Sequence, residues 1–298
     1  MTIDQPAVSR RFVPRMGSFL PRPTRLKLDT KGKVGLCILA FYILVAVFGP
    51  MLAQDPLKQD LIHRLQAPSS HHWLGTDALG RDVFGRMIAA TRTDLRFGFL
   101  AMLVPMVIGT LLGSVAGYLG GVVDAVVMRL ADLVQSFPVI LLFLGVAAAT
   151  NTNRSFGVLG PGELPIMIVF ALVGWVVYAR LVRAEILRIK NMDFIEAARS
   201  GGLSTPRILI RHLLPNAIPQ TIVYAVVDVG LAVLSLASIS YLGLGIPAPI
   251  PEWGAMINDG QIYLADQWWL VVAPGLAIAG LGIGLALVGD GLDDEIRR

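Results

Sequence analysis

Gly75 and Gly80 have the G-x-x-x-x-G spacing of a phosphate-binding loop, a motif that would give the chain nucleotide chemistry. The residues that follow do not suit a phosphate. Arg81 replaces the lysine of such a loop, and Asp82 replaces the hydroxyl side chain that holds Mg²⁺. Because a carboxylate there would repel a phosphate, and because no complete phosphate-binding loop occurs elsewhere in the sequence, we expect no ATP site on this chain.

Metal-ligand chemistry is not indicated either. His71 and His72 are adjacent and His63 is distant from them, so the histidines lack a ligand-like spacing. Cys37 is the single cysteine, which excludes an internal disulfide and a cysteine zinc site. We therefore predict that the chain itself binds no metal and no cofactor.

A charged stretch, residues 192–216, lies between two long apolar runs. Its charged residues stand among apolar ones, as in an amphipathic helix on the water side of a membrane; they are Glu196, Arg199, Arg207 and Arg211. Such a helix suits docking on a soluble partner. The alternative is an ordinary amphipathic connector.

The same stretch predicts two short helices. Asp193 as N-cap and Glu196 three residues later have the capping-box pattern of a first helix. Gly201–Gly202 should end this helix, because glycine destabilises a helix and accepts positive φ. Thr205 before Pro206 predicts the N-cap and first position of a second helix.

A carboxylate inside an apolar run is the third candidate for chemistry. Asp228 lies near the middle of the run 217–242, where a charge at bilayer depth is costly. We therefore expect it to line a polar translocation path or an interface with a partner subunit; the alternative is a hydrogen bond to another helix. Weaker candidates for a gate in such a path lie near the inner end of an earlier apolar run: Asp132, Gln135 and Ser136.

Membrane helices must position all of these residues. Of 298 residues, 55% are hydrophobic and 15% are charged, whereas a soluble domain carries about 25% charged residues. The mean hydropathy is +0.67. The net charge of +4 does not indicate nucleic-acid binding, because the basic residues gather at the ends of apolar runs, as in membrane proteins.

Six apolar runs are about long enough to cross a bilayer. We predict spans at residues 34–53, 97–119, 133–149, 165–182, 217–242 and 268–288. The expected fold is an all-α integral membrane protein with six transmembrane helices. Its predicted parts are a tail at 1–33, the first span and an outer loop at 34–96, a core at 97–290 that contains the 192–216 stretch, and a tail at 291–298.

Charge sets the expected orientation. The tail 1–33 and the stretch 192–216 are basic, whereas the loop 245–267 holds three acids and no lysine or arginine. The positive-inside rule then places both termini and the 192–216 stretch in the cytoplasm. The loop 54–96 lies outside although it carries basic residues, which its acids nearly balance.

Two motifs resemble those of a known family. Glu196-Ala197-Ala198, then Gly202, then Leu214-Pro215 resembles the EAA loop of ABC importer permeases, and Arg211-His212 with Asn216 is similar to its dipeptide/oligopeptide branch. Upstream, Leu74-Gly75-Thr76-Asp77 and Gly80-Arg81-Asp82 resemble a stretch that this branch carries after its first span.

The resemblance implies a type I ABC importer transmembrane domain that moves di- or oligopeptides, or similar small solutes, across the cytoplasmic membrane. Implied partners are a second related permease, two cytosolic ATPase subunits that hold ATP and Mg, and an extracytoplasmic substrate-binding protein. The assembled complex would be an ATP-driven translocase, and this chain no enzyme by itself. Relatives for nickel complexes or glutathione are the nearest alternative.

The resemblance also implies roles for residues. Glu196 would form an ion pair with a basic residue of the ATPase. Ala197 and Ala198 are small, as a helix that fits into a cleft requires. Arg199 would contact the ATPase or lipid headgroups. Gly202 would let the chain turn, and Pro215 would end the second helix. The segment 74–82 is either a turn held by its aspartates or a contact for a delivered substrate protein. A peptide amino terminus would be a natural counter-charge for Asp228.

Two rival functions remain. An ion-coupled secondary transporter gains little support, because Asp228 is the single deeply placed acid and paired half-repeats are not evident. A membrane scaffold without transport is the second. Co-purification of a separate ATPase would discriminate both from the importer.

Overall fold

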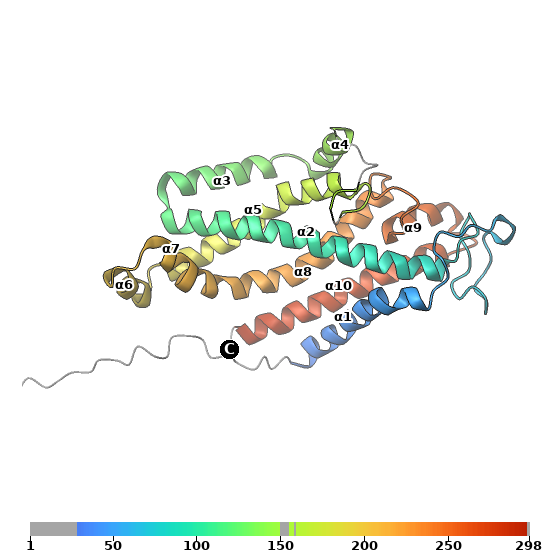
Figure 1. Cartoon of the computed structure of the whole chain (residues 1–298), viewed down its shortest axis with the longest axis horizontal. Coiled ribbons are helices and arrows are strands. Elements are labelled where there is room, and N and C mark those ends of the chain that lie inside the picture. Colours follow the sequence, from blue (N-terminus) through green and yellow to red (C-terminus); the bar gives the residue numbers. More distant parts are fainter. Residues whose placement is uncertain (1–28, 150–154, 158, 297–298) are drawn as a thin grey trace, which may run out of the picture.

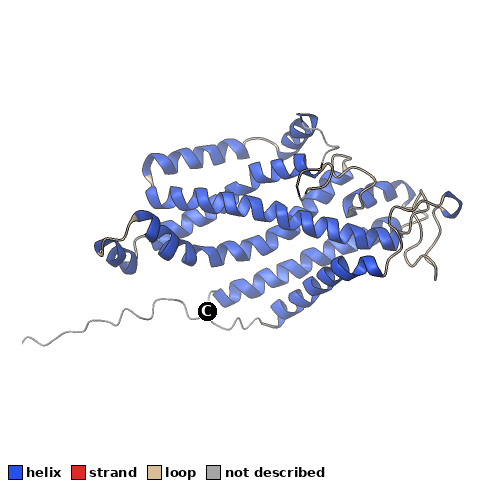
Figure 2. Ribbon diagram, viewed as in Figure 1, coloured by secondary structure: helices blue, strands red, loops and turns tan. Residues whose placement is uncertain are grey.

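The computed structural model describes residues 29–149, 155–157 and 159–296, and every regular element in these ranges is a helix (Figures 1 and 2). Five are long and apolar enough to cross a membrane: α1 (Thr30–Phe48), α2 (Val83–Leu119), α5 (Glu163–Ile189), α8 (Leu214–Tyr241) and α10 (Trp269–Ile296). The bent pair α3 (Gly121–Gln135) and α4 (Val139–Ala149) is apolar enough to make a sixth span if its two helices cross the membrane as one broken span. The all-α membrane fold is therefore confirmed, with five spans, or six if the bent pair counts as one.

The helices run roughly along one long axis (Figure 1). Helices α2 and α5 share the most extensive contact, α8 packs on both, and α1 pairs with α10. The short helices α6 (Asp193–Ser200) and α7 (Thr205–Ile208) lie at one end, and the start of α1 and the end of α10 point toward that end. The loop after α1 and the helix α9 (Trp253–Gly260) lie at the opposite end.

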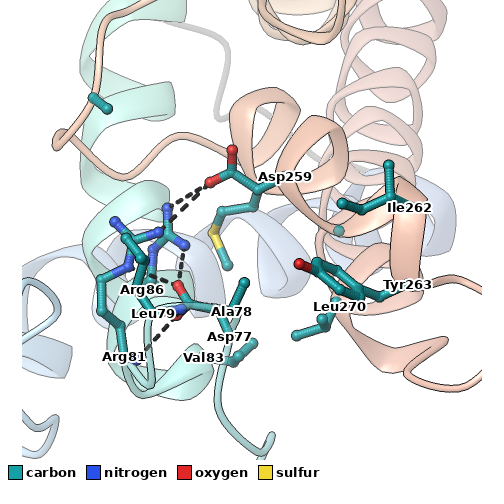
Figure 3. Close-up of a pocket in the computed structure, with 13 residues that line it drawn as sticks. Asp77, Ala78, Leu79, Arg81, Val83, Arg86, Asp259, Ile262, Tyr263 and Leu270 are labelled. Atoms are coloured by element: carbon teal, nitrogen blue, oxygen red, sulfur yellow. Dashed lines mark hydrogen bonds and ion pairs between the residues drawn. The ribbon is translucent and has the colours of Figure 1, made fainter. Parts of the chain in front are cut away.

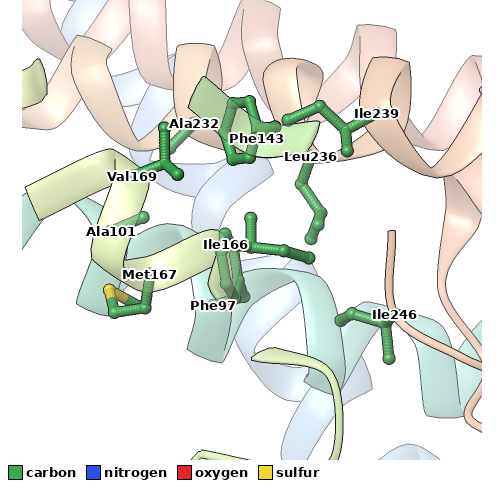
Figure 4. Close-up of a cluster of buried hydrophobic side chains, with 10 residues drawn as sticks. All are labelled: Phe97, Ala101, Phe143, Ile166, Met167, Val169, Ala232, Leu236, Ile239 and Ile246. Atoms are coloured by element: carbon green, nitrogen blue, oxygen red, sulfur yellow. The ribbon is translucent and has the colours of Figure 1, made fainter. Parts of the chain in front are cut away.

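Close contact between α2 and α5 depends on three glycines spaced four residues apart. A Cβ on Gly109 would lie 2.4 Å from the carbonyl oxygen of Trp175, and one on Gly113 would lie 2.3 Å from that of Ala179. Gly117 faces Ile186 in the same row. Small residues at this spacing let two backbones approach in lipid. Figure 4 shows the adjoining apolar core, where Phe97, Phe143, Ile166 and Leu236 bring α2, α4, α5 and α8 together.

The predicted third span, 133–149, is wrong in shape. The chain is helical from Gly121, breaks after Gln135, and resumes at Val139 with a bend of 83°. Pro138 explains the break, because proline lacks an N–H and disfavours the helical conformation in the residue before it. Helix α3 was missed as part of a span because its polar residues made it look like a link.

Other boundaries also differ from the prediction. Helix α2 begins at Val83, so the outer loop ends at residue 82 and not at 96. The predicted tail 291–298 continues α10 as far as Ile296. Pro215 does not end a helix; it lies in the first turn of α8, directly after the π-helical turn Leu209–Leu213. Of the predicted tail 1–33, residues 1–28 lie outside the described ranges.

Candidate functional site

The 192–216 stretch is fixed by its apolar side. Ile195 of α6, Ile208 of α7 and Leu213 are at most 1% exposed, and they pack with Val182 and Ile186 near the end of α5. A π-helical turn, Leu209–Leu213, then leads directly into α8. The stretch is therefore a rigid outgrowth of α5 and α8.

The polar side of the 192–216 stretch is exposed and faces away from the helices beneath it. Glu196, Ala197 and Arg199 are exposed, as are Arg207 and Arg211. Across the described ranges, the Glu196 carboxylate makes no hydrogen bond or ion pair. Exposed charges held on an apolar base, and not paired with each other, form a surface suited to a partner.

The predicted caps of this stretch are wrong in detail. Met192, and not Asp193, is the N-cap of α6, and no side chain caps this helix. Asp193 is the first residue of α6. Ser204, not Thr205, precedes α7, and it also makes no side-chain cap. The acids Asp193 and Glu196 still lie in the first turn of α6, where the helix dipole favours negative charge. Gly202 has φ of +77°, a conformation that favours glycine.

A buried ion cluster occupies the opposite end of the molecule (Figure 3). Asp77 Oδ2 lies 2.7 Å from Arg81 Nε and 2.5 Å from Arg86 Nη1, and all three side chains are nearly buried. Both guanidiniums also lie near Asp259, at 3.6 and 3.5 Å. The Asp77 Oδ1 accepts from the backbone N–H groups of Leu79 and Arg81, at 2.9 and 3.0 Å.

Neighbouring residues of the segment 74–82 also bond within the chain. Asp82 Oδ2 accepts from the N–H of Gly85, which caps α2, and Asp82 Oδ1 lies 2.9 Å from His72 Nδ1. The hydroxyl of Thr76 donates to the carbonyl of His63 at 2.5 Å. Leu74 packs in the apolar cluster beneath. Aspartates therefore do hold this turn together, and they join the loop after α1 to the α9 region.

The third region is a cavity of about 240 Å³ between α3–α4, α5 and α8. Asp228 and Gln135 both line it. The phenol of Tyr178 donates a hydrogen bond to Asp228 Oδ2 at 2.7 Å. Asp228 thus has both an internal hydrogen bond and access to a cavity.

Arg180 brings the gate candidates together. Its guanidinium lies 2.8 Å from Asp132 Oδ1 and donates to Gln135 Oε1 at 2.8 Å. The Ser136 hydroxyl bonds only to the backbone carbonyl of Asp132. One turn along α5, Arg183 pairs with Asp124. Two arginines of α5 therefore hold α3 at the end of the molecule that carries α6.

Sequence reasoning missed a second buried acid site. Asp94 of α2 and Glu252 are both 0% exposed. Asp94 Oδ2 accepts from the N–H of Trp253, and Glu252 caps α9 by accepting from Gly254 and Ala255. Burial raises the pKa of the Glu252 carboxyl. These residues are far apart in sequence, so no local signal could have joined them. Within the described ranges, no group of three or more potential ligands could hold a metal ion.

Comparisons with known proteins match most of the chain. Residues 109–298 match the family described as binding-protein-dependent transport system inner membrane component. Residues 24–68 match the N-terminal TM domain of oligopeptide transport permease C.

Curated relatives cover nearly the same length. The chain is 37% identical to the dipeptide transport system permease protein of Alkalihalophilus pseudofirmus, over 91% of this chain and 87% of the relative. It is 38% identical to the probable D,D-dipeptide transport system permease protein of Escherichia coli, over 86% and 84%. It is also 38% identical to the nickel transport system permease protein of the same organism, over 89% and 92%.

Proposed function

The chain belongs to the binding-protein-dependent transport system inner membrane components, and from this membership we propose the roles of its sites. It is a permease subunit of an ABC importer of the dipeptide/oligopeptide type. We propose that it moves di- or oligopeptides inward across the cytoplasmic membrane. Relatives named for nickel or glutathione keep those solutes as the alternative.

The exposed face of α6 carries the proposal. Glu196 makes no contact with another charged group in the described chain, although it stands on a firmly packed base. We assign it to an ion pair with a basic residue in a cleft of a cytosolic ATPase subunit, with Ala197 and Ala198 facing the cleft wall. Arg199 adds a contact to the ATPase or to lipid headgroups. ATP and Mg belong to that subunit.

Motion of the ATPase would reach the cavity along α5. This helix is continuous from Glu163 to Ile189, so it joins the base of α6 to Tyr178 and Arg180. Closure of the two ATPases would move α6, and through α5 it would change the arrangement of Asp132, Gln135 and Arg180. The cavity would then alternate between inward and outward access. A second, related permease completes the path, and an extracytoplasmic binding protein delivers the substrate.

This role sets the orientation that we propose. The start of α1 and the end of α10 point toward the end that carries α6 and α7 (Figure 1), so both termini would be cytoplasmic. The ion cluster around Asp77 and the helix α9 would then face outward, near the delivered binding protein.

The test is purification of the complex through this chain, wild type beside Glu196→Arg. We expect ATPase subunits to co-purify with the wild type, and the charge reversal to remove them or to uncouple ATP hydrolysis from transport. Asp294→Arg is the matched control, because Asp294 is exposed in the last turn of α10 and lies outside the 192–216 stretch. Absence of any ATPase from the wild-type preparation would favour a secondary transporter.

A further inference from the structure

The cavity beside Asp228 combines apolar walls with few polar groups. Helices α4 and α5 supply side chains such as Phe143 and Phe170, and the polar members of the lining are Gln135, Tyr224, Asp228 and Ser235. A mostly apolar hollow with a few convergent polar groups is the usual form of a small-molecule site. Its volume of about 240 Å³ is below the roughly 300–1,000 Å³ of sites for drug-sized ligands. The cavity would therefore hold one end of a peptide.

Asp228 is the one charged residue among the described residues that line this cavity. Its Oδ2 accepts from Tyr178, and no described residue donates to its Oδ1. Arg180 does not neutralise it, because that guanidinium is held by Asp132 and Gln135. A carboxylate at membrane depth without a basic partner requires a counter-charge or a proton.

An aromatic ring lies beside this carboxylate. Tyr224 and Asp228 are four residues apart on α8, which places them on one face of the helix. Tyr224 packs edge-to-face on Tyr178, with ring centroids 5.1 Å apart, and it too lines the cavity. An ammonium group in this cavity would form an ion pair with the carboxylate, and over the face of the Tyr224 ring it would also gain a cation–π contact. The same pair of groups would repel a carboxylate.

We propose that Asp228 and Tyr224 form a subsite for a primary ammonium group, and that the substrate passes with its amino end bound there. The subsite deepens the proposed function, on which its transport role rests. It favours solutes with a free amino terminus and disfavours anionic solutes or N-blocked peptides. Asp228 contacts the substrate directly, whereas Tyr178 is a positioning residue that fixes the carboxylate.

Uptake by the reconstituted complex with its binding protein tests the transport role. Alanyl-alanine and N-acetyl-alanyl-alanine are compared at concentrations that load the binding protein equally. We expect Asp228→Asn to reduce the uptake of alanyl-alanine by about tenfold and to leave the uptake of the acetylated peptide near its wild-type value. Asp228→Glu should recover part of the loss.

The matched control is Asp266→Asn, which removes an exposed carboxylate from the loop before α10. It should change the uptake of neither peptide. Wild-type uptake of alanyl-alanine by Asp228→Asn would overturn the proposal, and so would an equal loss for both peptides, since that would indicate a purely structural carboxylate.

A second measurement does not depend on transport. The purified complex in lipid nanodiscs is photolabelled with a small diazirine-bearing alkylamine or with its N-acetyl derivative, and labelled segments are found by mass spectrometry. We expect the free amine to label α8 and α4, alanyl-alanine to compete, and Asp228→Asn to lose the label. If the label is found although no peptide is transported, the proposed peptide import fails and the ammonium subsite stands. If peptides are transported but the amine labels wild type and Asp228→Asn alike, the subsite fails and the importer stands.

Discussion

At the end of the molecule that carries α9, Arg81 and Arg86 lie buried against Asp77. At the opposite end, Glu196 and Arg199 lie exposed, with no internal partner for the carboxylate in the described chain. Both regions contain charged motifs that resemble motifs of one protein family. In the cluster around Asp77 the charges pair within the chain, although Arg86 Nε is buried without a hydrogen-bond partner. On α6 the charges are supported by apolar packing alone.

The difference separates two uses of charge. Removing one partner of a buried ion pair leaves an uncompensated charge and costs about 3–5 kcal/mol of stability. The cluster around Asp77 therefore contributes to the stability of the folded chain. An exposed charge contributes little to stability, with a median of about 0–1 kcal/mol even when it is paired. The exposed charges on α6 should instead affect the binding of a partner, so changing them should have an effect only when the partner is present.

The largest effect is expected for Asp77→Asn. The change would leave two buried guanidiniums without their carboxylate, so we expect about 3–5 kcal/mol of destabilisation, seen as a lower unfolding temperature in detergent and a lower yield. Asp259→Asn removes the more exposed acid, whose side chain is 55% exposed, and should cost no more than about 1 kcal/mol. Equal effects of the two changes would break the comparison.

A pair of glycines gives the next test, because both have positive φ but different surroundings. Gly80 has φ of +70°, and a Cβ there would lie 1.7 Å from the carbonyl oxygen of Asp60. Gly202 has φ of +77° and nothing within 4 Å. We expect Gly202→Ala to cost about 1–2 kcal/mol for the left-handed conformation, and Gly80→Ala to cost about 1–3 kcal/mol more for the overlap. Thermal unfolding of the two variants measures the difference.

Salt should distinguish the two ends. An exposed ion pair between Glu196 and the ATPase is screened at high ionic strength, whereas buried pairs are screened much less. We therefore expect ATPase subunits to dissociate from the complex as salt rises, while the unfolding temperature of the permease itself changes little. Glu196→Gln should remove most of the salt dependence of association. If the ATPase subunits remain bound at all salt concentrations, apolar contacts and not the Glu196 ion pair hold them to the permease.

A smaller effect concerns the pH dependence of stability near α9. Burial raises the pKa of Glu252 in the folded state, so the folded chain holds this proton more tightly than the unfolded chain does. The stability that this contributes is full below the ordinary pKa of a glutamate and is lost as pH rises through the raised value. We expect Glu252→Gln to flatten this part of the stability profile in a pH series of unfolding temperatures. If the pH dependence of the unfolding temperature is the same in Glu252→Gln, another titrating group causes it.

Local signals in the sequence predicted much of this molecule. Apolar runs located the spans, and the charged stretch 192–216 was recognised by its contrast with its surroundings. The bend after α3 was missed although Pro138 was visible, because polar residues in α3 lowered its apolar content.

Contacts between distant residues could not be predicted. Arg86 and Asp259 are 173 residues apart, and Tyr178 and Asp228 are 50 apart. Their pairing depends on how α2, α5, α8 and α9 pack, which no local pattern encodes. The same holds for Asp94 and the N–H of Trp253, which are 159 residues apart.

The central claim is that the two ends face different partners, and site-directed crosslinking tests it most directly. In a Cys37→Ser background, Glu196→Cys and Asp259→Cys are introduced separately into the assembled complex in membranes, and a short bifunctional thiol–amine reagent is added. The account predicts that the cysteine at 196 crosslinks to the cytosolic ATPase and that the cysteine at 259 does not. A crosslink to the ATPase from position 259, or none from position 196 in a complex that hydrolyses ATP, would contradict it.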